Sequence, residues 1–211
     1  MSLILPFTYP WFFRKHLKGV ITVLDLGCGD GKFMAILNKE RKYKVTGVEL
    51  FDDYIKSAEK TGVYERVIKG DVSKIKFSPK SYDAVVCSQI VEHLTKNDGK
   101  LLLDKISIIA RKIVIVGTPN GHFHQEAYDK NVLQKHLSFW EPADFRKMGF
   151  KTYGQAMKFI YGENGLLNTL LARTSLKYLL YMLSYILSPA ACLYPSFGAH
   201  IIAVKNKGRH G

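Results

Sequence analysis

The chain has 211 residues, 47% of them hydrophobic, and a formal net charge of +13. This length supports one substantial hydrophobic core and is short for two ordinary domains, so we expect a single domain over residues 1–211. The excess of Lys and Arg would favour a polyanion such as RNA or an anionic membrane surface, but it is spread along the chain, as is typical of a basic solvated surface. The three cysteines, Cys28, Cys87 and Cys192, have no metal-ligand spacing and are expected to be reduced thiols.

Targeting and membrane-spanning signals are weak. The N-terminus lacks the basic-then-apolar order of a signal peptide, which favours a cytoplasmic protein. The most apolar stretch, residues 178–194, has seventeen residues without a charge and contains Pro189. Because a helix needs roughly 20 uninterrupted apolar residues to span a bilayer, this stretch is predicted not to span one.

Strand and helix patterns alternate along most of the chain. Apolar, β-branched runs predict strands at residues 20–26, 44–50, 64–69, 81–88, 112–118, 150–159 and 200–205. Stripes of apolar residues at helical spacing predict helices at residues 31–40, 52–60, 100–110 and 141–149. The order implies right-handed crossovers, and the predicted fold class is α/β: a doubly wound, Rossmann-like sheet of seven strands, mostly parallel with an antiparallel last strand and helices on both faces.

A glycine-rich turn follows the first predicted strand in the segment VLDLGCGDGKF, residues 23–33. In doubly wound sheets, ligands bind beyond the carboxyl ends of the strands, where this turn lies. A phosphate-binding P-loop is excluded because Lys32 is followed by Phe33 instead of Ser or Thr. The dinucleotide pattern G-x-G-x-x-G is excluded because Lys32 takes the place of its third glycine.

Three carboxylates lie at or just after the carboxyl ends of the first three predicted strands. Asp25 would repel a phosphate and suits a cationic ligand. Glu49 ends the second strand 20 residues after Gly29, the separation at which an acid accepts hydrogen bonds from ribose hydroxyls. Asp71 can accept from an exocyclic amine such as that of adenine. A ribose, an adenine and a positive centre without phosphate together describe S-adenosylmethionine.

The same segments resemble the class I S-adenosylmethionine-dependent methyltransferases. The matching pieces are VLDLGCGDG at 23–31, VEL ending at 50, GDV at 70–72 and YDAVVCSQIVEHL at 82–94. The resemblance extends over about residues 15–160 and is closest to the ubiquinone-pathway O-methyltransferases, the type 11/23 group. It implies a cofactor site in which Asp25, Gly27, Cys28 and Gly29 face the methionine part, Glu49 and Leu50 the ribose, Asp71 and Val72 the adenine, and Ser88 and Gln89 the sulfonium.

The acceptor side of the site is less well defined by the sequence. His93 follows the fourth strand and is the first candidate for a general base that would activate a hydroxyl acceptor. Glu92 and His93 could instead only hold the neighbouring loop in shape. His136, in a segment that resembles the acceptor-side segment of ubiquinone-type enzymes, is the second catalytic candidate, and Trp140 beside it would face the acceptor or belong to the core.

A metal site is also suggested by the resemblance but not assigned. In small-RNA 2′-O-methyltransferases, a similar constellation of two glutamates and two histidines holds a divalent metal. Here Gln89 takes the place of the first glutamate, which removes one charged oxygen ligand. His122, His124 or His136 could complete a Glu92/His93 site, but the sequence does not fix their positions, so no metal is predicted.

An apolar helical insertion is predicted at about residues 163–195, before the last strand. Leu and Ile residues line one side of residues 166–187, and Tyr178, Tyr181 and Tyr185 line the other, so the segment is apolar nearly all round. Three interpretations fit: a lid over an apolar acceptor, a homodimer face, or a peripheral membrane contact assisted by the positive charge.

The function predicted from the sequence is methyl transfer from S-adenosylmethionine to a small-molecule or lipid-like acceptor at a hydroxyl, with S-adenosylhomocysteine as product. Two alternatives remain. One is an RNA methyltransferase of the 2′-O type, with or without a metal, for which salt-sensitive RNA binding would be the signature. The other is a non-catalytic module of the same fold that binds a partner through its apolar insertion.

Overall fold

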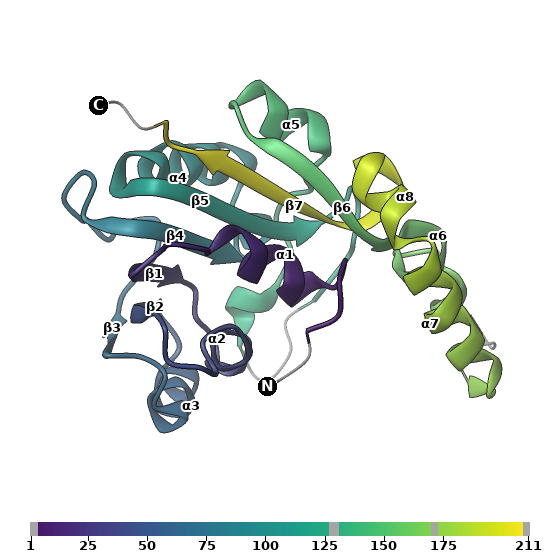
Figure 1. Ribbon diagram of the computed structural model, residues 1–211, viewed down its shortest axis with the longest axis horizontal. Coiled ribbons are helices and arrows are strands. Elements are labelled where there is room, and N and C mark those ends of the chain that lie inside the picture. Colours follow the sequence, from purple (N-terminus) through teal and green to yellow (C-terminus); the bar gives the residue numbers. More distant parts are fainter. Residues whose placement is uncertain (1–3, 127–130, 170–172, 209–211) are drawn as a thin grey trace.

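A seven-stranded sheet forms the centre of the molecule, with the strands in the order β3-β2-β1-β4-β5-β7-β6 (Figure 1). The computed structural model describes residues 4–126, 131–169 and 173–208. β7 runs antiparallel to β5 and β6, and the remaining neighbours pair in parallel. The predicted fold class is therefore confirmed, including the antiparallel last strand.

The seven strands lie close to the predicted ranges. They are β1 Thr22–Leu26, β2 Lys44–Glu49, β3 Arg66–Lys69, β4 Tyr82–Ser88, β5 Ala110–Pro119, β6 Lys151–Met157 and β7 Gly198–Asn206. The central strands are buried on both faces. For this reason their sequences are continuous apolar runs, without alternating polar residues.

Of the described helices, four match predicted ranges, two more lie in the predicted helical insertion, and the first and the sixth were not predicted. The helix bounds are α1 Tyr9–His16, α2 Lys32–Leu37, α3 Asp52–Thr61, α4 Lys96–Ile109, α5 Pro142–Lys147, α6 Lys158–Tyr161, α7 Leu176–Ile186 and α8 Ser188–Leu193. α4 begins four residues before its predicted start because Thr95 caps it, accepting a hydrogen bond from the Asp98 amide at 3.2 Å. α1 was missed because its pattern of consecutive aromatic residues has no clear helical period.

The sheet has a hydrophobic core on each face, and successive side chains of a central strand contribute to opposite cores. Val23 of β1 packs in a cluster with Phe12 and Phe13 of α1 and Met34 of α2. Leu24, one residue later, packs in a second cluster with side chains of α4 and α5. Because successive strand residues point to opposite faces, this division means that helices cover the sheet on both sides.

The N-terminal helix α1 brings an aromatic side chain to the carboxyl edge of the sheet. A β-carbon added at Gly117 in β5 would lie 1.9 Å from the Tyr9 hydroxyl oxygen and 3.0 Å from Phe13. The bare backbone at Gly117 is therefore what allows α1 to pack this closely. Tyr9 consequently reaches the region where strands β1 and β4 end.

A helical arm connects β6 to β7. We call α6, α7, α8 and the short 3-10 turns around them, residues 158–169 and 173–197, the arm; it projects away from the sheet at the right of Figure 1. Met157, Ile160, Leu180 and Ala191 form the small core at its base. Among the described helices, none is long and apolar enough to cross a membrane. The predicted insertion falls within this arm, and residues 170–172 of it lie outside the described residues.

The packing of α4 gives a prediction about stability. Gly99 lies inside this helix, where alanine alone would favour helix formation by about 1 kcal/mol. An added β-carbon, however, would lie 2.5 Å from the ring of the buried Trp140. We expect Gly99→Ala to destabilise the fold by about 1–3 kcal/mol through overpacking, measured by urea unfolding.

A double-mutant cycle with Trp140→Phe provides the control. The smaller ring leaves room beside Gly99, so the cost of Gly99→Ala is expected to fall by at least about 0.5 kcal/mol in the Phe background. An equal cost in both backgrounds would show that the contact with Trp140 is not the cause.

Candidate active site

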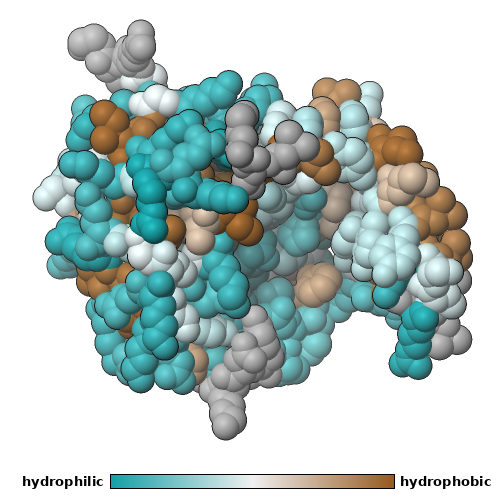
Figure 2. Space-filling view, turned by 60° about the horizontal axis from the view of Figure 1, so that its bottom comes forward, coloured by the Kyte–Doolittle hydropathy of each residue, from teal (hydrophilic) through white to brown (hydrophobic). Residues whose placement is uncertain are grey.

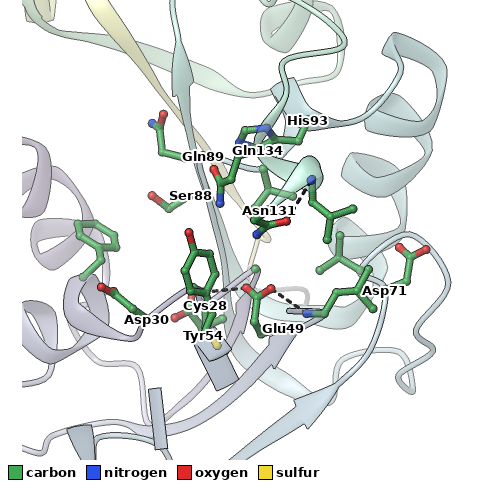
Figure 3. Close-up of a pocket in the computed structure, with 18 of the residues that line it drawn as sticks. Cys28, Asp30, Glu49, Tyr54, Asp71, Ser88, Gln89, His93, Asn131 and Gln134 are labelled. Carbon is green, nitrogen blue, oxygen red and sulfur yellow. Dashed lines mark hydrogen bonds between the residues drawn. The ribbon is translucent and has the colours of Figure 1, made fainter. Parts of the chain in front are cut away.

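A cavity of about 480 Å³ lies beyond the carboxyl ends of β1, β2 and β4. The strand order reverses between β1 and β4, so the cavity occupies the usual ligand position of a doubly wound sheet. All ten residues that the sequence assigned to the cofactor line it: Asp25, Gly27, Cys28, Gly29, Glu49, Leu50, Asp71, Val72, Ser88 and Gln89. Figure 3 shows Glu49 at the base of this cavity, with Asp30 and Asp71 on opposite sides and His93 at the far wall.

The glycine turn is shaped by backbone conformations that other residues seldom adopt. Gly27, Gly29 and Gly31 have φ angles of +65°, +54° and +78°. A β-carbon at Gly27 would lie 1.9 Å from Ile90, so the turn packs tightly on that side. At Gly29 a β-carbon would meet nothing within 4 Å, because it would point into open space. The turn therefore leaves room for a ligand at Gly29.

Glu49 ties the glycine turn to the end of β2. Its Oε2 accepts a hydrogen bond from the Gly29 amide at 2.9 Å, and its Oε1 accepts from the Leu50 and Phe51 amides at 2.8 and 3.0 Å. Each carboxylate oxygen has two lone pairs, so both of those on Oε1 are used and one remains on Oε2. The side chain thus holds its own loop and keeps one acceptor position for a ligand hydroxyl.

Asp25 is a buried carboxyl at the cavity wall. The Tyr64 hydroxyl donates to its Oδ2 at 2.8 Å. Burial raises the pKa of Asp25 to about 7, with the nearby Glu49 charge adding to the increase and the Tyr64 hydrogen bond opposing it. A cationic group placed beside Asp25 would favour its ionised form, so the side chain is suited to a positively charged ligand.

Acidic side chains dominate the polar lining. Asp25, Asp30, Glu49 and Asp71 line the cavity, and among the described lining residues there is no Lys or Arg. Asp71 is also tied to its loop, because its Oδ1 accepts from the Ser73 amide and hydroxyl at 2.9 and 2.6 Å. Burial acts to raise the pKa of Asp71, but these hydrogen bonds outweigh it and hold the pKa below its ordinary value. In a chain of net charge +13, this lining disfavours phosphates and favours cations.

The end of β4 is joined to the N-terminal helix by a short polar network. The Tyr9 hydroxyl lies 2.9 Å from the Ser88 hydroxyl and accepts a hydrogen bond from the side-chain Nε2 of Gln89 at 2.9 Å. Gln89 has a φ of +56°, a conformation that costs energy in a residue other than glycine. The network therefore fixes the orientation of Gln89 at the cavity and brings α1 into the site.

Glu92, His93 and His136 form a compact cluster beside the cavity. One ligand-type atom from each lies within 4.8 Å of the others. Nδ1 of His93 is 3.1 Å from the Lys135 carbonyl, and Nδ1 of His136 is 2.6 Å from the Phe123 carbonyl. Since a carbonyl only accepts, both Nδ1 atoms carry a proton, and in the neutral form of each ring the Nε2 atom then has a free lone pair.

The carboxyl group in this cluster is buried. Glu92 Oε2 accepts from the Thr118 hydroxyl at 2.9 Å, and Oε1 has no hydrogen-bond partner among the described residues. Burial raises the pKa of Glu92 to about 8 and lowers the pKa of His93, which favours neutral forms of both. One carboxyl oxygen and two imidazole nitrogens are a donor set that could hold a divalent transition-metal ion.

The other histidine and tryptophan candidates lie elsewhere. Nδ1 of His122 is 3.6 Å from Glu163, and Nε2 of His124 is 2.9 Å from Glu126, so neither joins the cluster. Trp140 is fully buried and donates its indole N–H to the Val91 carbonyl at 3.2 Å. Trp140 therefore belongs to the hydrophobic core and does not face an acceptor. His136 packs edge-on against His93 and does not line the cavity.

Several lining residues were not found from the sequence. They are Tyr9, Asp30, Phe33, Tyr54, Asn131 and Gln134, together with neighbouring apolar residues. Pro10 next to Tyr9 is a helix-start signal that could have pointed to α1. Asn131 and Gln134 reach the cavity only through long-range folding of the segment after β5, for which the sequence has no local signal.

Comparison with known proteins agrees with this architecture. Residues 23–112 match a methyltransferase domain family. Over 102 residues the chain is 36% identical to a probable (S)-tetrahydroprotoberberine N-methyltransferase 2 of Papaver bracteatum, and the match covers 44% of this chain and 27% of that protein. The chain thus spans about a quarter of the length of this curated relative.

Two solved structures show the same fold over nearly the whole chain. A SAM-dependent methyltransferase from Archaeoglobus fulgidus is similar with a TM-score of 0.61 and 20% identity, over 93% of this chain and 90% of that one. The small RNA methyltransferase HEN1 is similar with a TM-score of 0.62 and 16% identity, over 96% of this chain and 25% of that one. Residues 23–112 thus match a methyltransferase domain, and the fold of the whole chain is similar to that of these two methyltransferases. The ubiquinone-type subgroup remains a prediction.

Removal of the Glu49 carboxylate tests the ribose assignment. We expect Glu49→Ala to weaken binding of S-adenosylhomocysteine at least about tenfold in calorimetry, because a hydrogen bond to a charged acceptor contributes roughly 1.5–3 kcal/mol. Glu49→Gln, which keeps one accepting oxygen, is expected to fall in between.

The matched control is the neighbouring acid Asp52. It is exposed, pairs with Lys69 at 2.7 Å and does not line the cavity. Asp52→Ala should bind S-adenosylhomocysteine like the unaltered protein. Equal losses in the Glu49 and Asp52 variants would indicate a general charge effect and contradict the assignment.

The raised pKa of Asp25 predicts a pH-dependent stability. Because the folded-state pKa of about 7 lies above the ordinary value of 3.8, the stability from the protonated form is full below about pH 4 and is lost as pH rises through 7. The side chain of the Asp25→Asn variant does not titrate. As pH rises from about 4 to 7, the free energy of unfolding of this variant should therefore increase relative to that of the unaltered protein, by about 1.4 kcal/mol per pH unit.

The same variant should bind its ligand more weakly. Loss of the carboxylate removes the favourable interaction with a cationic methionine group, so the gain in stability at pH 8 should accompany weaker S-adenosylmethionine binding. Urea unfolding at pH 4 to 8 and calorimetry at pH 8 measure the two effects. A variant that is less stable at pH 8 and binds normally would contradict both assignments.

Proposed function

We propose that the protein transfers a methyl group from S-adenosylmethionine to a small-molecule or lipid-like acceptor, at a hydroxyl. The observation that carries the cofactor part is the acid-lined cavity at the strand-order reversal, which has carboxylates at the ends of β1, β2 and β3 and no Lys or Arg among its described lining residues. A nucleoside with a positive sulfur and no phosphate matches this charge pattern.

The assignment of the cofactor groups follows from the positions of the side chains. Asp25 and the backbone of Gly27, Cys28 and Gly29 would hold the methionine part, where the room at Gly29 leaves space for it. Glu49, with Leu50, would accept from a ribose hydroxyl. Asp71 and Val72 would face the adenine, and Ser88 and Gln89, oriented by Tyr9, would line the sulfonium side.

The bound cofactor would supply an electrophilic methyl group with a neutral thioether as leaving group. The task of the chain's own residues is then to hold the acceptor in line with that methyl group and to keep water away. His93 lines the cavity, and its Nδ1 donates a hydrogen bond to the Lys135 carbonyl. In the neutral ring, Nε2 then has a free lone pair that can accept a proton. This supports His93 as the base that accepts the acceptor's hydroxyl proton, with His136 packed against it as second candidate.

The Glu92, His93 and His136 cluster favours one alternative. These side chains could hold a divalent cation next to the acceptor hydroxyl, and such a site would suit a 2′-hydroxyl of RNA as well as a small molecule. HEN1, with which this chain shares its fold, is by its name a small RNA methyltransferase. The Papaver relative is by its name an N-methyltransferase of a small molecule, so the acceptor atom also needs a direct test.

A methyl-transfer assay on a metabolite and RNA panel identifies the acceptor. The panel is incubated with S-adenosylmethionine that carries a labelled methyl group, and transfer is followed by the label and by formation of S-adenosylhomocysteine. Transfer to a hydroxyl compound supports the main proposal, and transfer to RNA alone supports the alternative. Cofactor binding without transfer to any acceptor would support a non-catalytic module.

His93→Ala tests the base once an acceptor is known. We expect kcat to fall about 10²–10⁴-fold with S-adenosylhomocysteine affinity unchanged, because a positioned base contributes about that factor. His124→Ala is the control, since that exposed side chain pairs with Glu126 outside the cluster. Activity that survives His93→Ala would rule out the base, and loss of activity with a chelator, restored by added divalent metal, would favour the metal route.

A further inference from the structure

The outward side of α7 carries large apolar side chains that the described part of the chain leaves exposed to solvent. Tyr178, Leu179, Met182, Tyr185 and Ile186 are between 41 and 65% exposed. At 100° per residue, Tyr178, Tyr181 and Tyr185 form one stripe, Leu179, Leu183 and Ile186 form a second, and Met182 lies between them. Figure 2 shows hydrophobic atoms gathered along the outer edge of the arm, at the right.

The orientation of this side is fixed by the packing of the other one. Leu180 and Ser184 are buried against the base of the arm, and the Ser184 hydroxyl accepts a hydrogen bond from the Met157 amide at 3.1 Å. Further large apolar side chains are exposed at and just after the end of α8, where Leu193, Tyr194 and Phe197 are 75, 62 and 57% exposed. The apolar surface is therefore a stable feature of the arm that projects from the body.

Only positive charges accompany this surface. From Asn164 to Gly211 the sequence contains no Asp or Glu, whereas Arg173 lies three residues before α7 and Lys177 lies in its first turn. A second copy of α7 packed on this surface would bring like charges together, and the chain from Asn164 onward offers no acid to neutralise them. An anionic surface would complement these charges.

The stripes also match the layers of a lipid surface. Tyrosine has an apolar ring and a polar hydroxyl, which suits the headgroup level, and the Leu, Ile and Met side chains suit the acyl boundary. At 1.5 Å per residue, the eleven residues of α7 extend about 16 Å, against about 30 Å for a hydrocarbon core, so the helix would lie in the plane of the surface.

We propose that the arm is a peripheral membrane contact, in which α7 lies flat on an anionic lipid surface with Met182 and its neighbours in the headgroup–acyl boundary. A lid over the cofactor cavity is not supported, because none of the described residues that line this cavity belongs to the arm. The contact is independent of methyl transfer. It would bring the proposed enzyme to membranes, where a lipid-like acceptor resides.

A vesicle flotation assay tests the contact without cofactor or acceptor. The full chain is mixed at low salt with phosphatidylcholine vesicles that either contain or lack phosphatidylglycerol. We expect the protein to float with the anionic vesicles and to bind the neutral ones about tenfold more weakly. The double variant Met182→Glu/Ile186→Glu should lower binding to anionic vesicles at least about tenfold.

The matched control is Leu101→Glu/Ile108→Glu on the exposed side of α4. These side chains are 67 and 59% exposed, against 54 and 62% for Met182 and Ile186, and both double variants change the net charge equally. Thermal unfolding and S-adenosylhomocysteine binding verify that each variant folds. The control should float like the unaltered protein.

Three outcomes would overturn the proposal. The first is an unaltered protein that stays at the bottom of the gradient with anionic vesicles at low salt. The second is an equal loss in the α4 and α7 variants, which would reduce the effect to net charge. The third is a dimer in analytical ultracentrifugation that Met182→Glu/Ile186→Glu converts to a monomer while flotation is absent, which would make a second copy the occupant of the surface.

Discussion

The structure of the site depends on one carboxylate, that of Glu49, and the backbone amides around it. The amides of Gly29, Leu50 and Phe51 all donate to this side chain, so the glycine turn after β1 and the loop after β2 are held at a fixed separation. The turn can approach this closely because its glycines adopt positive φ angles. The cavity opens between the two loops, and Asp25 and Asp71 also line it.

Opposite charges are separated within a strongly basic chain. The cavity is lined by carboxylates, whereas the sequence from Asn164 to Gly211, which contains α7 and α8, has positively charged side chains and no Asp or Glu. Burial makes the carboxyl groups costly to ionise, as the raised pKa of Asp25 indicates, so a cationic ligand at this place would offset part of that cost. The same chain thus has one surface suited to a cationic nucleoside and another suited to an anionic lipid layer. The two proposals rest on different residues and can fail independently.

The sequence predicted the sheet well, because its strands are buried runs that alternate with helices and end in glycine or acid. The sequence identified four cofactor-site candidates because each lies at or just after the carboxyl end of a strand: Asp25, Glu49, Asp71 and Ser88. The topology of a parallel sheet brings these ends together. α1 and Tyr9 were missed, since close packing of α1 on Gly117 is not visible in a local pattern. The grouping of His136 with Glu92 and His93 was left open because it depends on how the segment after β5 folds back, and sequence spacing cannot fix that.

A crystal structure of the protein with bound S-adenosylhomocysteine would test the central claim most directly. The account predicts density in the cavity beyond β1, β2 and β4, with a ribose hydroxyl within hydrogen-bond distance of Glu49 Oε2 and the methionine part along Gly27–Gly29. An empty cavity at saturating ligand, or a ligand bound elsewhere while Glu49 contacts only its own loop, would contradict it.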